Sequence, residues 1–244
     1  MSATKPLELL FLGSGNAFAA EGRAFSSFLL DGRYLFDCGP TLLQQLQRAA
    51  LSTNEIGSVF ISHLHADHFF GLPFLFLDAK YGGRTRELTI IGPPGTQGVT
   101  RGLLDLGYPR LLNDSDRRYD LRFVEVSDGF NGRTEDLSFT AARVEHVPEI
   151  ECFAYRAELN GRSMVYSGDT TLCDGLLRLV DGAEVIVLEC SCQNVPVHLS
   201  PSDVAEVACH APDAKIIVTH LDGYPHPSNF EGLLVAHDFA RFTL

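Results

Sequence analysis

The chain has 244 residues, of which 45% are hydrophobic and 20% are charged, and its formal net charge is −12. This length allows one large domain or two small ones, and the composition is ordinary for a globular enzyme. The acidic charge argues against broad nucleic-acid binding, which usually needs a basic face, and the sequence shows neither a membrane-spanning apolar run nor a secretory signal pattern.

The first part of the chain predicts short strands joined by turns of small residues. Apolar segments indicate strands at 7–11, 27–30 and 34–36. The second and third form a hairpin around Asp31-Gly32, a favoured two-residue turn. Gly13-Ser14-Gly15-Asn16 follows the first strand, but it is no dinucleotide fingerprint because no helical pattern comes after it. We expect Thr41 to cap a helix that runs to about residue 50.

The most informative stretch is Ile61-Ser62-His63-Leu64-His65-Ala66-Asp67-His68. An apolar strand at 59–61 leads into it and an apolar helix at 69–77 follows it. Ligands bind at the carboxyl ends of strands in α/β sheets, and imidazoles and carboxylates are good ligands for Zn²⁺, Mn²⁺ and Fe. His63 and His65 can converge on one ion, whereas the adjacent Asp67 and His68 point elsewhere. The spacing therefore suggests two neighbouring ions.

The rest of the chain predicts further strands and helices without a linker. Strands are predicted at 88–91, 121–126, 137–144, 152–159, 163–166, 185–188 and 216–218. Helices are predicted after Gly95 to about 106, at 172–180, after a cap at Ser200, and at 230–239. The strands come in two batches, each followed by helices. We therefore expect one α/β (α+β) domain over 1–244, with two sheets face to face and helices outside.

Three more ligand-type residues follow predicted strands: His146, Asp169 and His220. A lone histidine is usually structural, but these positions agree with that of the central stretch and favour one common site. The six cysteines form no CxxC pair, which is typical of reduced thiols in a cytoplasmic protein. Cys190-Ser191-Cys192 is an alternative place for a metal.

The order His-x-His-x-Asp-His, His, Ser-Gly-Asp-Thr and Thr-His resembles the metallo-β-lactamase superfamily. The resemblance implies a four-layer αβ/βα sandwich with two divalent ions, zinc first and manganese or iron as alternatives. The implied ligands are His63, His65 and His146 for the first ion, Asp67, His68 and His220 for the second, and Asp169 as a bridge. Asp37 matches an acid that supports the ligands in this superfamily, although ordinary turn chemistry also explains it.

Within the superfamily, the sequence is most similar to the ribonuclease Z-like phosphodiesterases. Leu188-Glu189-Cys190 and Val197-His198-Leu199-Ser200 stand where ribonuclease Z has an acid and a histidine beside the metals. The resemblance thus implies a Glu189–His198 dyad. The alternative is an isolated carboxylate at a strand end and a histidine that flanks a helix.

One part of the ribonuclease Z pattern is missing. Ribonuclease Z carries a long arm that grips tRNA, between the histidine that matches His146 and the bridging acid. Here only residues 147–168 intervene, and two predicted strands consume most of them. This difference disfavours tRNA 3′ processing and favours small phosphodiesters or cyclic nucleotides as substrates.

The resemblance implies hydrolysis by a hydroxide that bridges two ions. Asp67 would orient it or accept its proton, and His198, held by Glu189, would protonate the leaving alkoxide. The alternatives are a carbonyl-ester hydrolase (lactonase or thioesterase), a tRNA 3′-processing endonuclease, and a metal-binding scaffold without activity. We expect a small phosphodiester or nucleotide as substrate, a homodimer, and no membrane. The loop Tyr224-Pro225-His226-Pro227-Ser228 lines the substrate mouth or only precedes the last helix.

Overall fold

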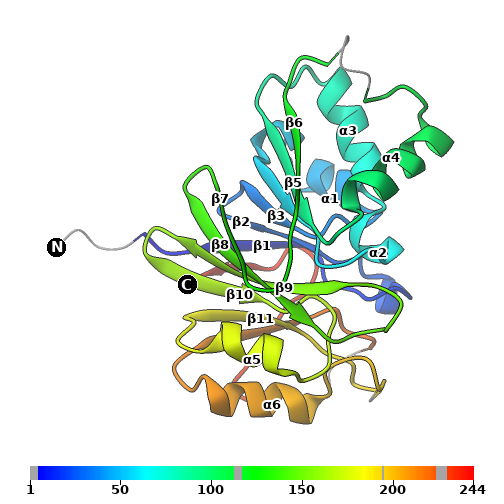
Figure 1. The fold of residues 1–244 in the computed structure, drawn as a ribbon. Helices are drawn as coiled ribbons and strands as arrows, with labels where there is room; N and C mark the ends of the chain where they lie inside the picture. The colour runs from blue at the N-terminus through cyan, green and yellow to red at the C-terminus, as the bar shows by residue number, and fades with distance from the viewer. Residues whose placement is uncertain (1–4, 113–116, 194, 224–229) are drawn as a thin grey trace.

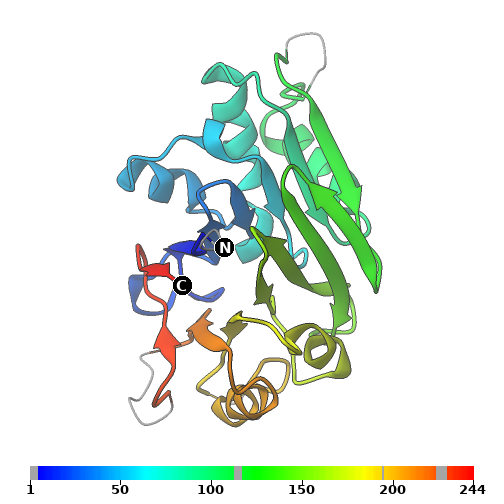
Figure 2. The same ribbon diagram turned by 90° about the vertical axis from the view of Figure 1, so that its left-hand side faces the viewer.

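The computed structural model describes residues 5–112, 117–193, 195–223 and 230–244. They form two seven-stranded sheets, with the strand orders β14-β1-β2-β3-β4-β5-β6 and β13-β12-β11-β10-β9-β8-β7. The sheets pack face to face and helices cover their outer faces (Figures 1 and 2). This arrangement confirms the expected αβ/βα sandwich.

Successive apolar side chains along the strands of the first sheet point to its two faces, so both faces are covered. Its strands are β1 (Glu8–Gly13), β2 (Ser27–Leu30), β3 (Tyr34–Phe36), β4 (Ser58–Phe60), β5 (Leu88–Gly92), β6 (Leu121–Glu125) and β14 (Arg241–Thr243). Its helices are α1 (Leu42–Arg48), α2 (Ala66–Phe69), α3 (Leu72–Tyr81) and α4 (Thr96–Gly107). Around β4, Phe60 joins the core between the sheets, whereas Val59 and Ile61 join the core under the helices.

The second sheet is built in the same way. Its strands are β7 (Phe130–Thr134), β8 (Leu137–Val144), β9 (Cys152–Leu159), β10 (Arg162–Tyr166), β11 (Val185–Glu189), β12 (Lys215–Thr219) and β13 (Leu234–Val235). Helices α5 (Asp174–Val180) and α6 (Pro201–His210) cover its outer face. The expected cap of α6 is present, because the Ser200 hydroxyl accepts the Asp203 amide and the Asp203 carboxylate accepts the Ser200 amide.

Aromatic rings fill the space between the sheets. Phe11, Phe28, Phe36 and Phe60 stand opposite one another on successive strands, with ring centroids 5.1, 4.9 and 4.8 Å apart. Tyr166 of the second sheet packs edge-on against Phe28 at 5.2 Å. Such pairs add about 0.5–1.5 kcal/mol each beyond their buried area; the phenylalanine pairs stabilise the first sheet, and the Tyr166–Phe28 pair joins the two sheets.

Strand direction sets where a site can form. Strands β3, β4, β5 and β6 are parallel, and so are β10, β11, β12 and β13. Strand β8 runs the same way as β10, because both are antiparallel to β9. The residues that follow the carboxyl ends of β4, β8, β10 and β12 therefore lie at one edge of the sandwich.

Three expectations about local structure were wrong. Residues 230–239 are not a helix: Leu234 and Val235 pair with β12, and Gly232 has a φ of +80°. Strands β7 and β14, which lie at sheet edges, were not predicted. Thr41 does not cap α1 with its side chain, because its hydroxyl accepts the Phe25 amide. The loop 224–228 lies outside the described residues. Within the described ranges, no helix has both the length and the apolarity to cross a membrane.

Candidate metal centre

The predicted ligands come together at the shared edge of the two sheets. His63 and His65 follow β4, Asp67 and His68 lie on α2, and the remaining three follow β8, β10 and β12: His146, Asp169 and His220. Each belongs to at least one group of residues whose ligand atoms all lie within 4.8 Å of one another. The sequence places them there because each directly follows a buried strand or starts the short helix after it.

The loop that carries the central motif is held from the opposite sheet. Tyr155 donates its hydroxyl to the Ile61 carbonyl at 2.8 Å, and the Phe153 amide donates to the Ser62 carbonyl at 2.9 Å. Both partners lie on β9, next to the strand that leads to His146. The ligands from the two sheets are therefore fixed relative to each other by backbone contacts.

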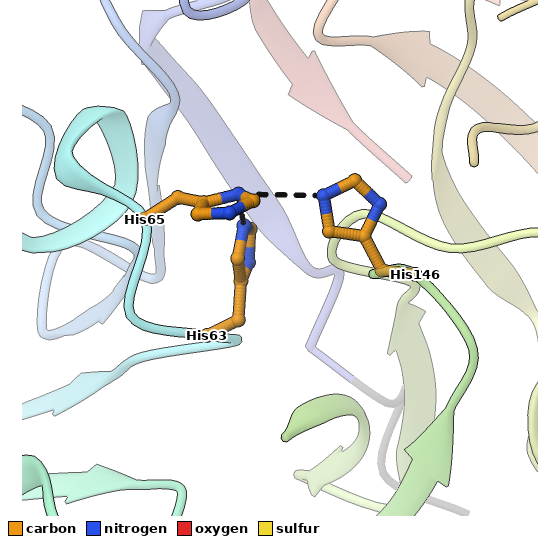
Figure 3. A group of neighbouring side chains, drawn as sticks. All are labelled: His63, His65 and His146. Atoms are coloured by element: carbon orange, nitrogen blue, oxygen red, sulfur yellow. Dashed lines mark hydrogen bonds between the residues drawn. The ribbon is translucent and has the colours of Figure 1, made fainter. Parts of the chain in front are cut away.

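His63, His65 and His146 form the first group (Figure 3). The Nε2 atom of His63 and the Nε2 atom of His146 lie 3.0 and 3.3 Å from Nδ1 of His65. Two ligands of a tetrahedral zinc ion lie about 3.3 Å apart when each zinc–nitrogen bond is about 2.0–2.1 Å. The three nitrogens thus have the spacing of donors around one ion.

Asp67, His68 and His220 form the second group. Oδ2 of Asp67 lies 3.3 Å from Nε2 of His68 and 3.3 Å from Nε2 of His220. Asp169 lies between the groups. Its Oδ1 is 3.4 Å from Nε2 of His68, and its Oδ2 is 3.9 Å from the Nε2 atoms of both His63 and His146. One carboxylate therefore faces both groups.

Outer contacts fix the histidine rings, as is usual for metal ligands. His68 donates from Nδ1 to Oδ2 of Asp37 at 2.6 Å, and His146 donates from Nδ1 to the Val197 carbonyl at 2.7 Å. Asp37 is fully buried and also accepts the Tyr166 hydroxyl at 2.6 Å and the Ser62 amide at 2.8 Å. Its φ of +55° is a left-handed conformation that costs about 1–3 kcal/mol in a non-glycine residue. Turn chemistry alone does not account for these contacts to a ligand.

Burial and charge prepare the two groups for a cation. Burial lowers the pKa values of His63, His65 and His146, so these imidazoles are neutral and can donate a lone pair. Burial also opposes protonation of His68 and His220, but Asp169 and neighbouring carboxylates outweigh it and raise both pKa values. The carboxylates of the second group thus favour a nearby positive charge. A bound divalent cation would provide that charge directly.

The donor atoms fit a metal for a further reason. Nε2 of His68 and Oδ1 of Asp169 are buried without a hydrogen-bond partner. A buried polar atom left in this way costs about 1–3 kcal/mol. Because a cation would satisfy both atoms at once, the residues present suit a metal site.

The predicted dyad lies directly beside this cluster. Nδ1 of His198 is 3.0 Å from Oε1 of Glu189 and 3.8 Å from Oδ2 of Asp169. Burial disfavours charge on His198, but the hydrogen bond and the charge of Glu189 outweigh it and raise the pKa of His198 to about 9. The same Glu189 oxygen accepts the amides of Thr170 and Leu199, both at 3.1 Å. The dyad is thus a built arrangement rather than two isolated side chains.

Two residues at the mouth of the site were not predicted. Asn16 and Phe18 line cavities that also contain His198 and His220. Their loop follows β1, and a backbone bridge joins Gly15 to Leu221 beside His220. The small-residue loop at a strand end was a usable signal, but its distance in sequence from every ligand hid the connection. The alternative site at Cys190 and Cys192 is absent from the groups of metal-ligating side chains among the described residues.

The sequence from 7 to 242 matches the family described as anti-Pycsar protein Apyc1. A ribonuclease BN from Enterobacter sp. (strain 638) is 28% identical over 292 aligned positions, which cover 93% of this chain and 93% of that relative. The metallo-β-lactamase fold protein YhfI from Bacillus subtilis superposes with a TM-score of 0.78 at 19% identity, covering 97% of this chain and 99% of YhfI. The short form of human tRNase Z superposes with a TM-score of 0.76 at 24% identity, covering 97% and 98% of the two chains.

These likenesses confirm the superfamily and the ribonuclease Z-like resemblance expected from the sequence. The structural neighbours establish the fold. The ribonuclease relatives and the ligand cluster confirm the expected class of enzyme, a metal-dependent hydrolase of phosphodiester bonds.

Proposed function

Since the chain belongs to the family of the anti-Pycsar protein Apyc1, we propose that its substrate is a small nucleotide phosphodiester, above all a cyclic nucleotide. The observation that carries this proposal is the shape and charge of the site mouth. Two cavities of 330 and 210 Å³ open beside the ligands, and among the described residues no lysine or arginine lines either one. Cavities of this size suit a small ligand.

The missing arm supports the same conclusion. Between His146 and Asp169 the chain contains only the antiparallel strands β9 and β10, which are part of the second sheet. The alignment with the ribonuclease BN relative has 292 positions, more than the 244 residues of this chain, so that relative carries residues that this chain lacks. A polyanion such as tRNA would also meet a chain with a net charge of −12.

In this proposal the two groups hold two divalent ions. His63, His65 and His146 would hold one, Asp67, His68 and His220 would hold the other, and Asp169 would contact both. We propose zinc because imidazole and carboxylate donors at tetrahedral spacing suit it, with manganese or iron as alternatives. When bound, such ions lower the pKa of water and neutralise charge on a phosphate.

The remaining steps belong to side chains. The Asp67 carboxylate orients the attacking water or accepts its proton. Glu189 fixes the ring of His198 through Nδ1, which leaves Nε2 to face the ester oxygen that departs. As the P–O bond breaks, His198 gives its proton to that oxygen, and water supplies the new oxygen on phosphorus. For a nucleoside 3′,5′-cyclic phosphate the ring opens, and the one product carries both the freed hydroxyl and the phosphomonoester.

A direct comparison of substrates tests this proposal. Zinc- or manganese-loaded protein is given a nucleoside 3′,5′-cyclic phosphate, a precursor tRNA, a lactone and a thioester at equal enzyme concentration. We expect a kcat/KM for the cyclic nucleotide well above the other three. A higher value for precursor tRNA would restore the processing role, and a higher value for the lactone or thioester would make the protein a carbonyl-ester hydrolase.

We also propose that the chain forms a homodimer through the outer face of α3 and α4. Phe70 and Phe74 precede and enter α3 at helical spacing, and they are 41% and 39% exposed. On α4, Val99 and Leu106 are spaced for one face and are 44% and 87% exposed. The two helices lie side by side in Figure 1, and Phe74 packs edge-on against Tyr108 at the end of α4, with ring centroids 6.3 Å apart. Phe74→Glu should convert a dimer to a monomer in light scattering, and a wild-type monomer would rule the dimer out.

A further inference from the structure

The metal-binding cluster opens into two adjoining cavities. The smaller, of 210 Å³, contains His65, Asp67, His146 and Asp169. The larger, of 330 Å³, contains Glu189, Gln193 and Asp222. Asn16, Phe18, His198 and His220 line both. A phosphate held at the ligands therefore has a neighbouring space, bordered by His198, for the group that it esterifies.

Phe18 is an unusual residue to find at this boundary. Its side chain is 89% exposed, although burying a phenylalanine is typically worth about 1.5–3 kcal/mol. Its loop is nevertheless well anchored. The Phe18 amide donates to Oδ1 of Asn16 at 3.1 Å, and the Ala19 amide donates to the Asn16 carbonyl at 2.9 Å. The fold thus holds an aromatic ring in solvent beside the reaction centre.

Backbone strain in the same loop favours a ligand-binding role for the exposed ring of Phe18. Ala19 has a φ of +48°, in the left-handed region that non-glycine residues rarely adopt. Such conformations persist where the surrounding structure demands them, and they cluster at ligand-binding sites. The start of this loop is held by the Ser14 amide, which donates to Asp238 at 3.0 Å, and by the bridge from Gly15 to Leu221.

Asp222 and Gln193 in the wall of the larger cavity are already hydrogen-bonded to their neighbours. The Asp222 carboxylate accepts the Ser191 hydroxyl at 2.5 Å, the Cys192 amide at 2.9 Å and the Gln193 amide at 3.2 Å. The Gln193 side chain in turn donates to the Asp222 carbonyl at 3.3 Å. These bonds shape the wall of the cavity, and the 89% exposed ring of Phe18 offers a large flat apolar surface to a ligand there.

We infer that the larger cavity is the nucleobase subsite and that Phe18 is its stacking platform. The inference rests on the proposed function. Every nucleobase has a flat π-face, and aromatic side chains bind it by stacking. In a nucleoside 3′,5′-cyclic phosphate both ester oxygens belong to one ribose, so the base lies on the side of the departing oxygen. That side is the one bordered by His198.

The test combines removal of the ring with removal of the base. Wild type, Phe18→Ala, Phe18→Leu and Phe18→Tyr are compared on a nucleoside 3′,5′-cyclic phosphate and on the ribose 3′,5′-cyclic phosphate that lacks a base. We expect Phe18→Ala to lower kcat/KM for the nucleotide by about 5- to 150-fold, the range that base–aromatic stacking supplies. Phe18→Tyr should restore activity and Phe18→Leu should not. On the base-free substrate all four proteins should be equal.

Binding provides a readout that does not depend on turnover. Affinity for the phosphorothioate analogue of the cyclic nucleotide, measured by calorimetry, should fall by the same factor in Phe18→Ala. Tyr81→Ala is the matched control, because Tyr81 is 75% exposed on α3 and is not among the residues that line the two cavities.

The possible outcomes separate the two proposals. Equal losses on both substrates, or unchanged affinity, would overturn the subsite while leaving the phosphodiesterase in place. Binding that depends on Phe18 without cleavage of any phosphodiester would overturn the proposed function while supporting the subsite.

Discussion

The general-acid role of His198 predicts a loss of activity that depends on the leaving group. His198→Ala removes the proton donor but none of the ligands in the two metal-binding groups, so the variant should keep its metal. An alkoxide leaving group needs a proton, whereas p-nitrophenolate departs without one. We expect kcat for a cyclic nucleotide to fall by ~10²–10⁴, and kcat for bis(p-nitrophenyl) phosphate to change little.

The loss of activity expected for Glu189→Gln follows from the effect of Glu189 on the pKa of His198. With a pKa of about 9, His198 is mostly imidazolium at pH 7.5. Glu189→Gln removes the charge that raises this pKa, and an ordinary value of about 6.5 leaves roughly a tenth of the histidine protonated at that pH. The variant should therefore lose about tenfold on the cyclic nucleotide. Nearby divalent ions would lower the pKa of His198 in both proteins, and with the same gap between the two pKa values the loss at pH 7.5 would then exceed tenfold.

The assay is a pair of pH–rate profiles on the two substrates. A general acid acts when protonated, so the rate on the cyclic nucleotide should fall as pH rises through the pKa of His198. In Glu189→Gln this fall should occur at lower pH. Elemental analysis of each variant confirms that the metal content is unchanged. Equal losses on both substrates in His198→Ala, with full metal content, would refute the general-acid role.

The metal-binding groups make three more predictions. Asp37→Ala removes the hydrogen bond that orients His68, so metal affinity measured by calorimetry should fall by ~10–100-fold; wild-type affinity would contradict a supporting role. Asp169→Ala should abolish nearly all activity and lower the metal bound per chain, and an unchanged metal content would show that the carboxylate is not a ligand. Chelation should lower the melting temperature, because metal at 100 times its Kd adds about 2.7 kcal/mol to the free energy of unfolding; an unchanged melting temperature would mean that the ions bind weakly or not at all.

Much of the site was predictable because each ligand follows a buried strand. The apolar runs before His63, His146, Asp169 and His220 indicated strands, and the carboxyl ends of parallel strands meet at one edge. The Glu189–His198 dyad was predictable only through the resemblance, since the carboxylate and the imidazole come from different segments. The structure shows the contact between Glu189 and His198, but the catalytic role of the dyad stays a prediction.

Other features depend on contacts that the sequence does not display. β13 has only two residues, and its pairing with β12 overrode the helical spacing of the apolar residues around it. β14 lies at the edge of the first sheet beside β1, more than two hundred residues away in sequence. Phe18 was hidden for the same reason, because its loop is joined to the site by contacts between distant segments, such as the bridge from Gly15 to Leu221. The single domain and the cytoplasmic location stay predictions.

The most direct test of the central claim is the turnover of bis(p-nitrophenyl) phosphate by zinc- or manganese-loaded protein. Chelated protein serves as the control, and a lactone and a thioester are run alongside. The account predicts phosphodiester cleavage that disappears on chelation and returns when metal is restored. Good cleavage of the lactone or thioester with none of the phosphodiester would contradict it.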